Sequence, residues 1–245
     1  MVVAAQVPTQ SEKVKEIELP IIDLSIERSK VSNLIVKACE EFGFFKVINH
    51  CVPEFVIKTM EAESWGFFAK PGSEKQRAGP ANPYGYGSKT IGFNGDVGEV
   101  EYLLLRANFQ SISQSSNTIS NDPIKFRCAV SSYIEEVRGL ACEILDLMAE
   151  GLGVPPSAMT NGRFVSVRHR ALANSNKPRM SIAYFGAPPL HSRITPLPEL
   201  LIPGFRPALY SPFTWAEYKK AAYSLRLSDS RLDLFRTQER DVETA

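Results

Sequence analysis

The sequence predicts an α+β protein in which most helices come before the strongest strand signals. Two patterns indicate this order. A helical pattern begins at Asp122 and Pro123 and runs to about Glu150, and only after residue 158 does a strong strand alternation appear. Before the long helix, shorter strand and helix signals follow one another. We therefore expect a helical N-terminal region and a C-terminal region built from β-structure.

The first expected elements are short. Residues 19–24 and 44–49 are rich in β-branched and aromatic side chains, which favours two strands. Between them, Ser32 is expected to cap a helix that Gly43 ends. The apolar positions of that helix are Leu34, Ile35, Ala38, Cys39 and Phe42. A second helix is expected to begin at Pro53. Its apolar side carries Val56, Met60 and Phe67.

Two stretches are expected to be irregular loops. Residues 79–98 are rich in glycine and proline, and residues 110–120 are rich in serine. Loops as long as the first are usually functional or disordered. A strand is expected at residues 100–105. Three tyrosines of this region are candidates for lining a substrate pocket, although packing in the core or on the surface explains them equally well: Tyr84, Tyr86 and Tyr102.

The long helix has clear ends. Asp122 is expected to cap it and Pro123 to occupy its first position, and Gly151 and Gly153 are expected to end it. Its expected buried stripe consists of Ala141, Leu145 and Met148. A last helix is expected to follow Thr214, because the segment from Thr214 to Glu217 is a capping box.

A hairpin is expected after the long helix. Residues 163–172 alternate in polarity and place His169 on the apolar face, and residues 179–185 form the return strand. By itself, His169 is also explained as a core histidine. Arg179 and Ser181 share one face, where a guanidinium beside a hydroxyl suits a carboxylate, although a structural ion pair explains the arginine as well.

The composition is that of an ordinary globular protein. The chain has 245 residues and a net charge of +1, which favours neither nucleic acid nor an acidic membrane as a partner. The four cysteines lack C-x-x-C spacing, so we expect reduced thiols. We expect no signal peptide, and no apolar run approaches the ~18 residues of a membrane span. The expected location is the cytoplasm, with the nucleus as an additional compartment.

Several motifs together resemble those of plant 2-oxoglutarate- and Fe(II)-dependent dioxygenases. ACEEFGFFKVINH at 38–50 is similar to the N-terminal signature of that family, and LPIIDLS at 19–25 is similar to its opening strand. Further segments resemble the gibberellin 2-oxidases within it: NPYGYGSK at 82–89, EYLLL at 101–105, NGRFVSVRHR at 161–170, NSNK at 174–177 and RMSIAYF at 179–185. The resemblance covers two blocks, roughly 17–157 and 159–227.

The resemblance implies a site and a reaction. It implies a jelly-roll domain that hydroxylates carbon 2 of a gibberellin and so inactivates the hormone, with Fe(II), 2-oxoglutarate and ascorbate as metal, cosubstrate and activator. His169 matches an iron ligand, and Arg179 and Ser181 match the pair that binds the far carboxylate of 2-oxoglutarate. His50 belongs to the N-terminal signature and is not an iron ligand. Cys51 replaces the usual glycine, which predicts strain if the position needs a positive φ.

Two of the three iron ligands implied by the resemblance have no candidate. Such oxygenases hold Fe(II) with two histidines and one carboxylate on one face of the metal. None of His50, His169 and His191 begins a His-x-Asp or His-x-Glu. The stretch that should carry that pair, together with several strands, is expected between Ala158 and Met159, where the chain runs straight on.

We therefore expect an incomplete jelly roll that lacks its middle strands and a chain that is catalytically inactive. The alternative function is a non-catalytic interaction protein that associates with intact homologues, and a third reading has iron held jointly with a second chain. The expected divisions are a disordered N-terminus (1–16), the N-terminal dioxygenase region (17–158), the residual jelly roll (159–210), and the C-terminal helix and tail (211–245).

Overall fold

The computed structural model describes residues 18–91, 98–154, 160–166, 178–201, 207–224 and 231–237. They form a mixed α and β structure, as predicted. Its elements are β1 (Ile21–Asp23), α1 (Arg28–Glu41), β2 (Lys46–Ile48), α2 (Glu54–Phe68), α3 (Gly72–Lys75), the 3-10 helix η1 (Gln76–Ala78), β3 (Gly85–Ile91), β4 (Gly98–Leu104), α4 (Phe109–Ile119), α5 (Pro123–Leu152), β5 (Arg193–Ile194), η2 (Pro198–Leu200), β6 (Phe213–Thr214), α6 (Trp215–Ser224) and η3 (Arg231–Phe235).

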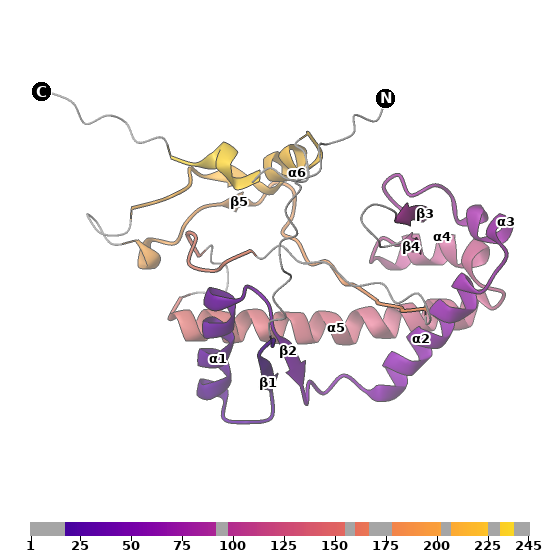
Figure 1. The fold of residues 1–245 in the computed structure, drawn as a ribbon, viewed down its shortest axis with the longest axis horizontal. Coiled ribbons are helices and arrows are strands. Elements are labelled where there is room, and N and C mark those ends of the chain that lie inside the picture. The colour runs from indigo at the N-terminus through magenta and orange to yellow at the C-terminus, as the bar shows by residue number, and fades with distance from the viewer. Residues whose placement is uncertain are drawn as a thin grey trace, which may run out of the picture.

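The long helix α5 joins two separate hydrophobic cores (Figure 1). The first lies where α1 and β1 pack against the C-terminal end of α5, and its buried residues are Ile22, Val31, Ile35, Ala38, Cys39 and Leu147. The second lies where α2 and α4 pack against the N-terminal end, and its buried residues are Met60, Phe67, Ile112, Ile119, Phe126 and Val130. Between Ser131 and Asp146, no residue of α5 is fully buried.

The strands pair only two at a time in the part of the chain that the structure describes. β1 pairs with β2 in parallel, whereas β3–β4 and β5–β6 are antiparallel. The strands predicted at 19–24, 44–49 and 100–105 are confirmed. The prediction of a loop at 79–98 is wrong where β3 forms. The glycines of β3 alternate with larger residues, and the strand pairs with β4.

The serine-rich stretch is a helix, so the loop predicted at 110–120 is wrong. Asn108 caps α4 by accepting a hydrogen bond from the backbone N–H of Ser111 at 2.8 Å. The buried positions Ile112, Ser116 and Ile119 have helical spacing. The hydroxyl of Ser116 donates to the carbonyl oxygen of Ser113, so burying this serine leaves no unsatisfied polar group.

The helices predicted at both ends of the N-terminal region are confirmed, with corrections. α1 begins at Arg28, so Ser32 lies inside the helix and does not cap it. α5 has the predicted cap, with the Asp122 carboxylate accepting from the backbone N–H of Lys125. Its predicted buried stripe was wrong at Leu145, which is 55% exposed, whereas Met148 packs half-buried against the first core and the fully buried positions are Leu147 and Ala149. α2 buries Val56, Met60 and Phe67 as predicted.

The hairpin predicted after the long helix is not formed in the described residues. Residues 163–166 belong to no strand, and neither do residues 178–189, which run as an extended segment (Figure 1). Residues 167–177, with His169 and the predicted turn, lie outside the described residues, as do residues 1–16.

The capping box of α6 is confirmed, since Thr214 and Glu217 exchange hydrogen bonds. The division of the chain into four regions stays a prediction. Among the described helices, none is both long and apolar enough to span a bilayer.

Candidate functional site

Arg179 and Ser181 lie on one side of an extended segment that runs along α5 toward α2 (Figure 1). Burial alternates along this segment. Met180, Ile182 and Tyr184 are half-buried, and Ile182 packs against the second hydrophobic core. Arg179 and Ser181 are exposed on the opposite side. The predicted shared face of these two residues is therefore present without the predicted strand pairing.

The guanidinium of Arg179 is free to bind an anion. No hydrogen bond or ion pair joins Arg179 or Ser181 to another described residue. An exposed guanidinium beside a hydroxyl can hold one carboxylate by charge-assisted hydrogen bonds. A single exposed contact of this kind is weak, because water and salt screen it.

The described residues do not supply an iron site. They contain no group of three or more histidine, cysteine, aspartate or glutamate side chains arranged to hold a metal. His50 lies in the turn before α2, where its Nδ1 accepts a hydrogen bond from the backbone N–H of Val52 at 3.2 Å. His191 is exposed before β5. His169 lies outside the described residues, and the residue two positions beyond each histidine is not a carboxylate.

The hairpin β3–β4 separates two of the candidate substrate tyrosines. Gly87 pairs with Tyr102 and Tyr86 pairs with Leu103, so Tyr86 and Tyr102 point to opposite faces. The Tyr102 ring lies over Gly87, where an added Cβ would be 2.3 Å from its Cζ. Tyr84 is 45% exposed, and its ring stacks with the guanidinium of Arg106. One pocket wall therefore cannot hold both Tyr86 and Tyr102, and the substrate role of the three tyrosines stays a prediction.

Tyr86 belongs to a polar network that anchors the hairpin. The Tyr86 hydroxyl donates to the Glu101 carboxylate, and the Lys75 ammonium lies 2.5 Å from the same carboxylate. Lys75 also donates to the carbonyl oxygen of Phe68 at 3.1 Å. Burial opposes ionisation of Glu101, but the hydrogen bonds from Lys75 and Tyr86 outweigh it and lower its pKa. This network was missed from the sequence, because no local spacing links Lys75 to Glu101.

The turn after β2 confirms the strain predicted at Cys51. Cys51 has φ 59° and Asn49 has φ 53°, both in the left-handed region. Asparagine tolerates this region better than cysteine does, and the one local hydrogen bond that the Cys51 thiol forms with a described residue is a long one, which it donates to the Asn49 carbonyl oxygen at 3.8 Å. The side-chain amide of Asn49 donates to the Asp23 carboxylate at 2.8 Å and ties the turn to β1. The glycine usual at position 51 in the resembling family fits this geometry.

Comparison with solved structures identifies the fold. A rice dioxygenase for auxin oxidation superposes with a TM-score of 0.71 at 19% identity, covering 90% of this chain and 100% of that one. The structure described as JOX2 in complex with 2OG, Fe and JA superposes with a TM-score of 0.72 at 20% identity, covering 90% and 89%. The fold is therefore that of 2OG-Fe(II) oxygenases.

Sequence comparison identifies the family. Residues 19–103 match the N-terminal domain of non-haem dioxygenases in morphine synthesis, and residues 156–188 match the 2OG-Fe(II) oxygenase superfamily. Gibberellin 2-beta-dioxygenase 4 of Arabidopsis thaliana is 40% identical over 90% of this chain and 95% of its own length. Gibberellin 2-beta-dioxygenase 1 of Pisum sativum is 38% identical over 87% and 89%. The chain belongs to the gibberellin 2-beta-dioxygenase family of 2OG-Fe(II) oxygenases.

The alignment with the Arabidopsis relative is longer than this chain. It extends over 313 positions, whereas 90% of 245 residues is about 220, so about 90 aligned positions contain no residue of this chain. The match to the oxygenase superfamily likewise spans only residues 156–188.

Proposed function

We propose that this chain is a gibberellin 2-beta-dioxygenase family member that does not hydroxylate gibberellin by itself. The proposal is supported by the metal ligands that the sequence offers. An iron site of this family needs two histidines and one carboxylate, and none of the three histidines starts a His-x-Asp or His-x-Glu. His50 accepts a hydrogen bond in its own turn, and His191 lies far along the chain near β5.

The proposed remnant of the active site has one of the three iron ligands and the pair of residues for one end of 2-oxoglutarate. His169 is the one remaining iron ligand, and Arg179 and Ser181 are the remaining pair for the far carboxylate of 2-oxoglutarate. A single imidazole does not hold Fe(II) with an ordered set of open positions. Without the metal, 2-oxoglutarate has only its Arg179 end bound, so no oxygen activation follows.

The missing part of the fold supports the same proposal. About 90 positions of the aligned Arabidopsis relative have no counterpart here. We place this gap between Ala158 and Met159 and propose that it removes the middle strands of the jelly roll together with the His-x-Asp pair. The extended segment 178–189 pairs with no strand among the described residues, which is consistent with that loss.

The experiment is a turnover assay on the purified chain. We expect no gibberellin-dependent succinate above background with Fe(II), ascorbate, 2-oxoglutarate and oxygen, while the Pisum sativum relative run in parallel forms succinate. A chimera that carries the relative's segment between Ala158 and Met159 is expected to recover turnover. Clear gibberellin-dependent succinate from the unmodified chain would overturn the proposal.

A second candidate function is association with an intact homologue. The observation that favours it is the two-stranded parallel sheet β1–β2, because parallel sheets are normally covered on both faces. Ile22 and Val47 face the first core, whereas Ile21 and Ile48 on the other face are 60% and 47% exposed. Co-purification of the two chains from a common host is expected, with Ile21→Lys/Ile48→Lys abolishing it. Failure of the unmodified chain to associate would remove this function.

A further inference from the structure

The extended segment 178–189 is held to the helices by one face only. Its burial alternates in the part nearest α2: Met180, Ile182 and Tyr184 are half-buried, and the residues between them are exposed. Ile182 packs against the second hydrophobic core. This is the alternation of a β-strand that covers one side of a helical layer and turns its other side to water.

The backbone of this segment is unpaired. Residues 179–185 form no backbone hydrogen bond with another described residue. In a strand, the N–H and C=O groups point sideways, perpendicular to the side chains, so packing of one face on the helices leaves these groups available. A strand has two such edges, and pairing with another strand needs only one of them. An open edge of this kind is a template for a further strand.

The sequence of the segment limits how a second strand can align with it. Pro178 precedes residues 179–185 and Pro188 follows soon after, and proline cannot donate a hydrogen bond to a neighbouring strand. Between the prolines, the exposed face carries one charge, on Arg179, and ends in Phe185. The Phe185 side chain is 86% exposed, so contact with a second strand would shield a large apolar surface from water.

An antiparallel pair of two copies fits these constraints. When Ile182 lies opposite Ile182 of the second copy, Arg179 lies opposite Phe185. Each guanidinium then stacks on an aromatic ring, and the small side chains of Ser181 and Ala183 face each other beside the centre. Parallel pairing in register would instead set the two Arg179 side chains next to each other, and like charges in neighbouring strands are destabilising.

This alignment closes on two copies. Both copies use the same strand, so a two-fold axis relates them and every contact occurs twice. The half-buried side chains of Met180, Ile182 and Tyr184 then lie on the same side of the strand pair in both copies. A two-stranded sheet is marginally stable alone, and here each of its strands already packs against helices.

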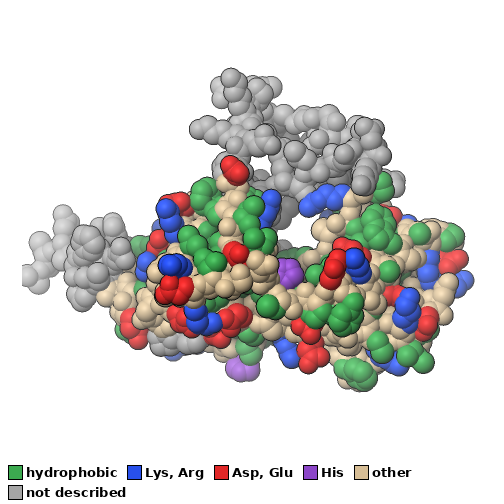
Figure 2. Space-filling model, turned by 90° about the horizontal axis from the view of Figure 1, so that it is seen from below, with side chains coloured by type: hydrophobic (Ala, Val, Ile, Leu, Met, Phe, Trp, Pro, Cys, Tyr) green, Lys and Arg blue, Asp and Glu red, His purple; other side chains and the backbone are tan. Residues whose placement is uncertain are grey.

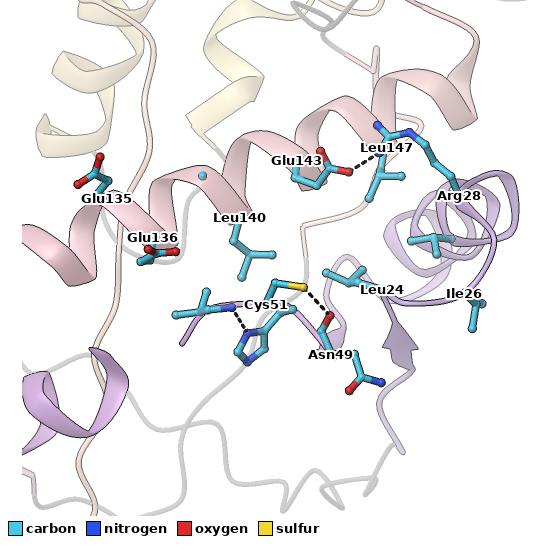
Figure 3. Close-up of a pocket in the computed structure, with 14 residues that line it drawn as sticks. Leu24, Ile26, Arg28, Asn49, Cys51, Glu135, Glu136, Leu140, Glu143 and Leu147 are labelled. Atoms are coloured by element: carbon cyan, nitrogen blue, oxygen red, sulfur yellow. Dashed lines mark hydrogen bonds and ion pairs between the residues drawn. The ribbon is translucent and has the colours of Figure 1, made fainter. Parts of the chain in front are cut away.

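The segment is separate from the hollowed surface of the described structure. None of its residues lines the pocket of about 500 Å³ between α5 and the turn that follows β2 (Figure 3). On the face seen in Figure 2, apolar side chains are interspersed with charged ones. Pairing through the segment therefore leaves the pocket open.

We propose that two copies of this chain associate by antiparallel pairing of residues 179–185, with Ile182 at the two-fold axis. The partner follows from an unpaired backbone, an exposed phenylalanine and a sequence that places the single charge of the segment opposite an aromatic ring. The association does not depend on the proposed loss of turnover, and it uses a surface other than the face of Ile21 and Ile48.

Sedimentation velocity of the purified chain over a range of concentrations tests the association. We expect a reversible dimer and no larger species. Phe185→Lys places a like charge opposite Arg179 in both symmetric contacts and is expected to weaken the dimer at least about fivefold. Phe185→Glu places a carboxylate there and is expected to retain the dimer. Raising the salt concentration should weaken this variant's dimer more than the unmodified one.

Matched controls test the location. Phe109, the first residue of α4, is 70% exposed, and Phe109→Lys is expected to leave the dimer unchanged. The variant Ile21→Lys/Ile48→Lys is expected to leave it unchanged as well. A chain that stays monomeric at every concentration, growth beyond two copies, equal dimer strength of Phe185→Lys and Phe185→Glu, or loss of the dimer in either control would each overturn the proposal.

Discussion

Gly151 of α5 lies so close to Ser32 of α1 that a Cβ at position 151 would stand 2.7 Å from the Ser32 carbonyl oxygen. The same Cβ would stand 2.7 Å from a methyl group of Val36. This contact lets the two helices approach where they enclose the first hydrophobic core. Arg28 reinforces it on the surface by bridging from α1 to Glu143 and Glu150.

The two helix glycines of α5 are expected to respond to alanine in opposite directions. Gly151→Ala should lower the free energy of unfolding by about 1–3 kcal/mol, because the added methyl group overpacks the α1–α5 contact. Gly139→Ala should raise it by about 0.5–1 kcal/mol, because alanine favours the helix and meets no neighbour there. Urea denaturation measures both. Equal effects of the two substitutions would contradict the helix contact.

The buried ammonium of Lys75 is expected to be important for stability. Its side chain is 10% exposed and that of Glu101 is 28% exposed. Lys75→Met should cost up to about 3 kcal/mol, because it leaves a partly buried carboxylate without its cation. Lys58→Met removes an exposed pair with Glu54 and should cost less than about 0.5 kcal/mol. Urea denaturation measures the free energy of unfolding of both variants. Similar decreases for Lys75→Met and Lys58→Met would refute the role of the network.

The same network predicts a pH dependence. The folded pKa of Glu101 lies below its ordinary value of 4.5, so its ionised form stabilises the folded state. That contribution is complete above the unfolded pKa and is lost as the pH falls through the lower folded pKa. Glu101→Gln should therefore flatten the loss of stability below about pH 4.5. Stability is measured by urea denaturation across this pH range. If the unmodified protein and Glu101→Gln lost stability equally as the pH falls, Glu101 would not be the group that titrates.

Local signals predicted some elements, and distant contacts decided the others. The caps at Asp122 and Thr214 lie within three residues of their partners, so the sequence showed both helix starts. The helix α4 was missed, because its buried Ser116 is recognisable only once its hydroxyl is seen to bond back to Ser113. The buried stripe of α5 was misplaced, because α1 and α2 pack against its two ends and leave Leu145 exposed.

The candidate site, too, could be predicted only where neighbouring residues carry the signal. The alternation around Arg179 and Ser181 could be predicted, because it needs only the polarity of neighbouring residues. The strand predicted at 179–185 was wrong, because a strand requires a partner and residues 178–189 pair with no strand in the part of the chain that the structure describes. The pairing of Lys75 with Glu101 and Tyr86 depends on how α3 meets the hairpin, which no local pattern records.

The strained turn at Cys51 predicts a stabilising substitution. Cys51→Gly should raise the free energy of unfolding by about 1 kcal/mol, because glycine adopts φ 59° without the steric penalty of a Cβ. Cys51→Ala keeps the Cβ and should not stabilise the protein. Thermal or urea denaturation compares the three chains. A gain with alanine equal to that with glycine would mean that removal of the thiol, not relief of strain, is responsible.

The half-site at Arg179 predicts weak, metal-independent binding of dicarboxylates. Because the proposed pair of one guanidinium and one hydroxyl would contact only the far carboxylate, 2-oxoglutarate and glutarate should bind with equal, weak affinity in an NMR titration. Mn²⁺, added as a redox-stable substitute for Fe(II), should not tighten 2-oxoglutarate binding. Arg179→Ala should abolish binding of both and change stability by less than about 0.5 kcal/mol, since the side chain is exposed. A tenfold or greater gain in 2-oxoglutarate affinity with Mn²⁺, absent for glutarate, would reveal a working metal site and overturn the proposed loss of catalysis.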